Sequence, residues 1–154
     1  MSIRVAFDHP ANAEVLAHLR SHARPGAAES ASPGEVEDPY YNLGTHPDLV
    51  EWFWDRLPEK TRGKCKWIVH GWPVLVHPGS GILFGFAGGT HTYALRLPPD
   101  LARDLVAKGA KRTHAYPDGS TLDLGVIGPG WILGGWNQEE KDWCATAHEA
   151  AGDA

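Results

Sequence analysis

The spacing of apolar residues changes along the chain between helical and extended patterns, which predicts an α+β protein. Between residues 45 and 57 the apolar side chains recur three and four positions apart, as on one face of a helix. Pro47 suits the first turn of this helix, and Pro58 would end it. We therefore expect an amphipathic helix at the start of the compact part of the chain.

Residues 64–97 have the pattern of short strands separated by tight turns. Extended apolar or alternating runs cover residues 66–70, 73–77, 81–87 and 91–97, with glycine, proline and serine between them. Because links this short join neighbouring antiparallel strands, we expect a meander.

The second half of the chain adds a helix and a hairpin. Pro98 and Pro99 open a helical pattern, and Gly109 is placed for a left-handed C-terminal cap. Two strands, at residues 111–116 and 121–127, then flank an Asp-Gly turn.

A further short strand is expected at residues 131–136, and a last helix begins at Asn137. Trp143, Cys144 and Ala147 would form the buried face of that helix. The resulting fold is α+β, with a mostly antiparallel meander sheet of five to seven strands and helices packed on one face.

The N-terminal segment is expected to be attached only loosely. Residues 8–23 form a short helical pattern with a narrow apolar stripe of Val15, Leu16 and Leu19, and the next stretch is rich in proline, glycine, serine and glutamate. The predicted division is a loosely attached helix within residues 1–24, a flexible linker at 25–43, a compact α+β domain at 44–150 and a tail at 151–154.

Composition favours a soluble protein of the cytoplasm. The 154 residues are 42% hydrophobic and 21% charged, with a net charge of −5, and the apolar runs are too short to span a membrane. The N-terminus lacks the basic and then apolar pattern of a secretory signal. Two cysteines in a chain of this size are expected to be buried thiols, and no motif calls for a cofactor.

Several short motifs resemble a known superfamily. They are a glycine-punctuated strand pair at residues 79–86, the strand Tyr93-Ala94-Leu95-Arg96-Leu97 leading into a helix, the exit Lys108-Gly109-Ala110, the strand His114-Ala115-Tyr116-Pro117, and a last helix begun by Trp136-Asn137 and carrying Trp143. With them, residues 70–150 resemble the small α+β superfamily of the TfoX N-terminal domain and the YjbR/MmcQ-type proteins. The resemblance implies the fold; a regulatory or nucleic-acid role, suggested for some members, would transfer poorly to an acidic chain.

Strand parity predicts one open, polar sheet face. Successive side chains of a strand point to opposite faces, so the apolar residues of these strands would pack under helices. The opposite face would be a surface for a ligand or partner, or simply solvated. Its residues would be Lys66, His70, His77, Thr92, Arg96, Thr121 and Asp123.

Six of the seven tryptophans divide into two groups. Trp54, Trp67 and Trp143 occupy apolar positions of their elements and are expected in the core. The others of interest, Trp52, Trp72 and Trp136, lie on a polar helix side or beside glycine and proline. They would line a recognition surface or pack under loops.

Histidines supply the alternative of a metal-assisted or hydrolytic enzyme. His70, His77 and His91 belong to neighbouring predicted strands, and Asp123 would add a carboxylate. However, no pair has the local spacing of metal ligands, and no nucleophile elbow or phosphate loop is present.

The first hypothesis is therefore a non-catalytic binding or regulatory module for a protein partner or small ligand, with no catalytic residue assigned. Its candidate binding residues are His70, Trp72, His77, Arg96, Asp123 and Trp136. A third alternative, nucleic-acid binding, is disfavoured by the net charge. It would need one basic stripe of Lys66, Arg96, Lys108, Lys111 and Arg112.

Overall fold

The computed structural model describes residues 5–23, 26–27, 29–32, 51, 65–87, 93–115, 119–134 and 141–153. Apart from Glu51, the helix expected at residues 45–57 lies outside this part of the chain. Most of the expected linker, together with Trp52, Trp54, His91, Thr92 and Trp136, also lies outside it.

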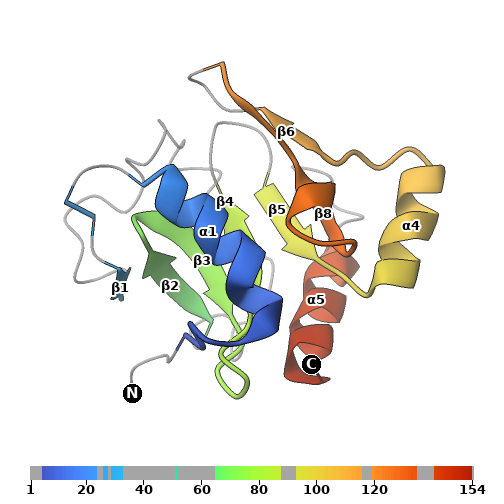
Figure 1. The fold of residues 1–154 in the computed structure, drawn as a ribbon. Coiled ribbons are helices and arrows are strands. Elements are labelled where there is room, and N and C mark those ends of the chain that lie inside the picture. The colour runs from blue at the N-terminus through green and yellow to red at the C-terminus, as the bar shows by residue number, and fades with distance from the viewer. Residues whose placement is uncertain are drawn as a thin grey trace.

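The centre of the fold is a six-stranded antiparallel sheet in the order β1-β2-β3-β4-β5-β8 (Figure 1). Strands β2 to β5 follow one another as the expected meander, and the α+β class with an antiparallel sheet is confirmed. The strands are β1 (Ser30–Ala31), β2 (Lys66–Val69), β3 (Trp72–Val76), β4 (Leu83–Ala87), β5 (Tyr93–Arg96) and β8 (Trp131–Gly134).

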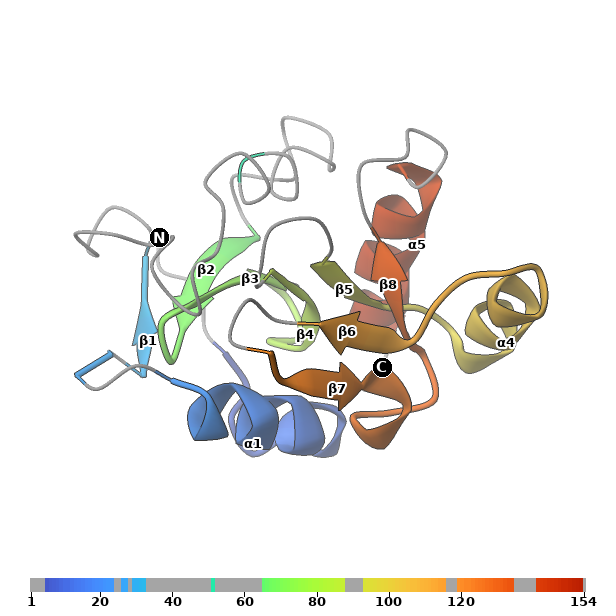
Figure 2. The ribbon, with the colours of Figure 1, turned by 90° about the horizontal axis from the view of Figure 1, so that it is seen from above.

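Helices cover both faces of this sheet. Seen from above, α1 (Ala13–Ser21) lies on one side of the strands and α5 (Lys141–Asp153) on the other, with α4 (Pro99–Ala107) beyond β8 (Figure 2). A short 3-10 turn, η1 (Pro10–Asn12), leads into α1. None of the described helices is long and apolar enough to cross a membrane.

Two buried layers therefore sandwich the sheet, and the prediction of one open polar face is wrong for these strands. Every residue of β3 and β4 is buried, whichever way its side chain points. The α1 side includes Val15, Leu16, Leu19, Trp67, Trp72, Phe86 and Trp131. The α5 side includes Cys65, Ile68, Leu75, Phe84, Tyr93, Leu95, Ile132, Cys144, Ala147 and Ala151. Both cysteines are buried, as expected.

A bulge in β4 assigns its aromatic residues to opposite layers. Leu75 pairs with Gly85 and the next residue, Val76, pairs with Leu83, so Phe84 is the extra residue. As a result Phe84 faces α5, whereas Phe86 faces α1.

The N-terminal helix is an integral part of this fold, which differs from the loose attachment expected. Its apolar stripe is fully buried against the sheet. In addition, the buried Asn12 side chain donates hydrogen bonds to the carbonyl oxygens of Ala6 (2.7 Å) and Gly81 (3.0 Å) and accepts one from the Leu83 N–H (2.9 Å). These bonds tie the start of α1 to the β3–β4 connection.

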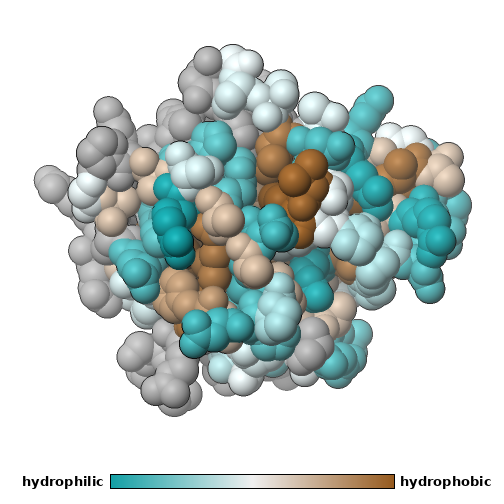
Figure 3. All heavy atoms as spheres, viewed as in Figure 1, coloured by the Kyte–Doolittle hydropathy of each residue, from teal (hydrophilic) through white to brown (hydrophobic). Residues whose placement is uncertain are grey.

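The predicted hairpin forms, but as a separate ribbon. Strands β6 (Thr113–Ala115) and β7 (Thr121–Asp123) pair with each other, not with the main sheet. The second strand ends early because the Asp123 carboxylate accepts the Gly125 N–H (2.9 Å) and starts a 3-10 turn, η4 (Leu124–Val126). A hydrophobic patch lies over this turn, where Val126 is 69% exposed (Figure 3).

Helix α4 ends as the sequence predicts. Gly109 has a φ of +110°, its N–H donates to Val106, and the N–H of Ala110 donates to Leu105. This is the Schellman arrangement, in which a left-handed residue caps the last carbonyl groups.

Candidate ligand-binding cleft

A cleft of about 590 Å³ opens where four separate segments of the chain meet. They are the turn before α1, the β5–α4 connection, the loop before β8 and the second half of α5. The lining residues are Pro10, Ala11, Arg96, Leu97, Pro98, Pro99, Ile127, Gly128, Pro129, Gly130, Trp131, Thr146, Glu149, Ala150 and Asp153.

Proline and glycine fix two of these walls. Pro98 precedes α4 with an extended backbone (φ −53°, ψ 135°), and Pro99 occupies the first helical turn, so strand β5 turns directly into α4. The Leu97 N–H donates to the Gly130 carbonyl at 2.8 Å. A Cβ atom at residue 130 would overlap the Leu97 carbonyl, so only glycine permits this approach.

Arg96 is the cationic group of the cleft. It is the last residue of β5, lies opposite Trp131 in β8, and is half-buried. Burial lowers the pKa of its guanidinium. Within the described part of the chain, no hydrogen bond or ion pair engages this side chain, so a half-buried charge is left without a counter-ion.

Glu149 and Asp153 supply the acidic groups. They lie four residues apart on one face of α5 and close to its C-terminus, where the helix dipole is negative. No ion pair among the described residues joins either carboxylate to Arg96. The cleft therefore presents both signs of charge, and no ion pair between described residues joins them.

Trp131 forms part of the apolar wall. It is only 1% exposed, and its ring packs against Phe86 with centroids 5.5 Å apart. Because it contacts both the core and the cleft, its fluorescence would report events in either place.

Of the predicted binding residues, Arg96 lines this cleft, whereas Trp72 is a core residue. Trp72 is 0% exposed, its indole N–H donates to the Leu19 carbonyl (3.1 Å), and its ring meets Phe86 edge-on at 5.6 Å. It therefore fastens α1 to the sheet and has no surface for recognition.

His70 lies in the two-residue turn between β2 and β3. Both turn residues have positive φ, 50° at His70 and 85° at Gly71, as a type I′ hairpin requires. The ring is 8% exposed. Burial, followed by the charge of Arg20, lowers the His70 pKa, and Glu29 opposes this shift.

His77 lies at the opposite end of β3. Its Nδ1 atom accepts the N–H groups of Gly79 (3.0 Å) and Ser80 (3.2 Å), and its ring packs against His148 of α5 at 4.8 Å between centroids. Since a strand rises about 3.3 Å per residue, β3 keeps His70 and His77 well apart. Asp123 is exposed and caps η4.

The structure thus does not assemble the histidine and aspartate cluster considered above, of which His91 lies outside the described residues. In the described part of the chain no group of three or more histidine, cysteine, aspartate or glutamate residues could hold a metal ion.

Sequence reasoning missed Trp131, Glu149 and Asp153 as residues of the cleft. The prolines at 98, 99 and 129 were the available signal, because such residues often form the rigid walls of loops. No sequence pattern near these prolines indicates that their loops contact α5.

No protein-family model, curated protein or solved structure matches the chain. The resemblance to the TfoX and YjbR/MmcQ superfamily therefore stays a prediction.

Proposed function

We propose that the protein is a binding module for a small ligand with an anionic group, which occupies the Arg96 cleft. The observation that carries this proposal is the half-buried Arg96 guanidinium, which lines a hollow of about 590 Å³ without a described counter-ion. Small-molecule sites typically measure about 300–1,000 Å³ and combine apolar walls with a few polar groups.

The lining indicates how such a ligand would be held. A carboxylate or phosphate would accept charge-assisted hydrogen bonds from Arg96, and these bonds are strong when the guanidinium is shielded from water. Pro98 and Pro129 offer apolar contact to the body of the ligand. Glu149 favours a hydrogen-bond donor or an ammonium group at another point of the ligand.

The test is a binding screen with amino acids, small carboxylates and sugar phosphates, followed by tryptophan fluorescence and ligand-observed NMR. We expect Arg96→Gln to weaken the binding of any hit roughly tenfold or more, since hydrogen bonds to charged groups contribute about 1.5–3 kcal/mol. Arg96→Lys should retain part of the affinity.

Arg20→Gln is the matched control, because Arg20 is exposed on α1 and its loss changes the net charge equally. A hit that Arg96→Gln binds as tightly as the wild type would reject the cleft as its site. Failure of every compound class to bind would reject the proposal itself.

A further inference from the structure

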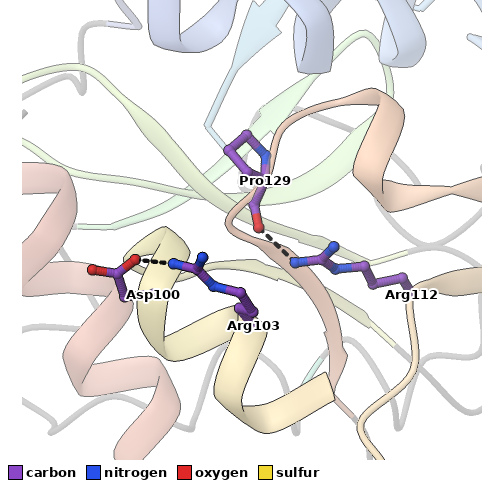
Figure 4. Close-up of polar contacts among 4 residues, drawn as sticks. All are labelled: Asp100, Arg103, Arg112 and Pro129. Atoms are coloured by element: carbon purple, nitrogen blue, oxygen red, sulfur yellow. Dashed lines mark hydrogen bonds and ion pairs between the residues drawn. The ribbon is translucent and has the colours of Figure 1, made fainter. Parts of the chain in front are cut away.

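Two more arginines face a smaller hollow on the other side of Pro129. This notch measures about 280 Å³ and is lined by Pro99, Arg103, Arg112 and Pro129. Figure 4 shows that Arg103 extends from α4 and Arg112 from the segment before β6, with Pro129 above both guanidinium groups. Pro99 and Pro129 are shared with the cleft.

Arg112 is held in place but retains an unused donor. Its Nη2 atom donates to the Pro129 carbonyl (2.7 Å), and its backbone carbonyl accepts the Leu124 N–H (2.7 Å). Its Nε atom is shielded from solvent and has no hydrogen-bond partner among the described residues. Because a shielded atom cannot contact a ligand without rearrangement, the Arg112 donors available to the notch are the remaining N–H groups of its Nη atoms.

Arg103 is oriented by an ion pair with Asp100, one turn earlier on α4. Both side chains are largely exposed, so this pair is weak and leaves most of the positive charge at the notch in place. Within the described structure, two positive charges face the notch against one carboxylate, and most of their N–H donors have no partner.

From this arrangement we propose that the notch binds a phosphoryl group. Two planar guanidinium groups present more donors than one carboxylate can accept, whereas a phosphate offers several oxygens to both. The remaining walls are prolines, which add no competing N–H and no negative charge. This site is separate from the proposed function of the cleft, because it needs neither Arg96 nor a ligand beside it.

The test follows the Arg Nε–Hε signals of the full chain by ¹H–¹⁵N NMR during titration with inorganic phosphate, and with acetate at matched ionic strength. We expect phosphate to shift the Arg112 and Arg103 signals. Arg103→Gln should weaken phosphate binding roughly tenfold or more. Arg20→Gln should leave it unchanged.

Arg103→Gln is preferred to Arg112→Gln, because Arg112 also bonds the loop at Pro129 and its loss would disturb local structure. A second titration with glycerol phosphate separates the two sources of the group: equal or tighter binding supports a phosphate ester, and weaker binding supports free phosphate. An Arg112 signal that does not respond to phosphate, or responds equally to acetate, overturns the proposal. Loss of the Arg112 and Arg103 responses in Arg96→Gln would assign the phosphate to the cleft instead and would also overturn the proposal.

Discussion

The two faces of the sheet are attached to their helices in different ways. On the α1 face, large rings interlock: Phe86 lies 5.6 Å from Trp72 and 5.5 Å from Trp131, measured between ring centroids. On the α5 face, the fully buried residues of the helix are short: Cys144, Ala147 and Ala151. The α1 face is stabilised by contacts between large rings. The α5 face is stabilised by the close approach of the helix to the sheet.

This difference determines where each face tolerates change. Interlocked rings lose many contacts at once when one is removed, because protein interiors are close-packed. A helix that lies close to a sheet through small residues is instead sensitive to added atoms. It is also sensitive to charge, since the pair of His77 and His148 lies in the α5 interface.

The largest effect is expected on the α1 face, from Trp72→Ala. The substitution leaves a cavity and removes the hydrogen bond to Leu19, so the free energy of unfolding should fall by about 3–5 kcal/mol. Urea denaturation followed by circular dichroism measures this loss. Trp72→Phe is the control, because it keeps an aromatic ring and removes the indole N–H, and it should lose only about 1–2 kcal/mol. A loss below about 1 kcal/mol for the alanine variant would refute the role given to these rings.

An intermediate effect is expected on the α5 face, from Gly152→Ala. A Cβ at residue 152 would lie 2.7 Å from the His77 Nε2 atom, and the His77 ring cannot easily turn away because its Nδ1 accepts two backbone N–H groups. We expect the variant to be destabilised by about 1–2 kcal/mol, although alanine is the better helix former.

A double-mutant cycle with His77→Ala sharpens this prediction. Without the imidazole, the same Gly152→Ala change should be neutral or stabilising by up to about 1 kcal/mol, because only its helix propensity remains. If Gly152→Ala changed the free energy of unfolding in the same direction with and without the His77 imidazole, close approach to His77 would not determine its effect.

The smallest effect is expected from pH. Burial, followed by the charge of His77, lowers the pKa of His148, and Glu149 opposes this shift. The unfolded chain then binds a proton more readily than the folded one, so stability is fully present above about pH 6.5 and falls as the pH drops below it. Unfolding midpoints measured between about pH 8 and pH 5 should therefore fall as the pH is lowered.

His148→Gln should reduce that pH dependence but not abolish it. The pKa of His70 is also lowered, chiefly by burial, so His70 contributes in the same direction from the other end of β3. His70→Asn is the matched variant, since asparagine tolerates the left-handed backbone of this turn. If His148→Gln left the dependence of stability on pH unchanged, the α5 face would not be the source of the acid sensitivity.

The parts of the fold that local patterns encode could be predicted. The meander, α4 with its Gly109 cap and the strand at Trp131 depend on residues that are near one another in the chain. The role of α1 could not be predicted, because its narrow stripe becomes a full interface only against Trp72 and Phe86. Likewise, the Asn12 side chain forms hydrogen bonds with Gly81 and Leu83, about seventy residues away in the sequence.

The open sheet face was a misinterpretation of polar residues at strand ends. Lys66 starts β2, His70 lies in the turn and His77 follows β3, so these residues terminate strands and do not form a stripe across them. The continuous apolar run from Trp67 to Val69 was the better indication, because a strand buried on both faces lacks alternation. For the binding site, sequence could indicate Arg96 alone, since the cleft requires four distant segments.

The strand order also has a consequence for how the chain reaches this structure. Strands β2 to β5 are neighbours in sequence as well as in space, whereas β1 and β8 join the two edges from distant segments. Closing a longer loop costs more entropy before any contact repays it. We therefore expect the four-stranded meander to form as the nucleus and the edges to dock later. The cleft, whose walls include the start of β8, would then be among the last features to be completed.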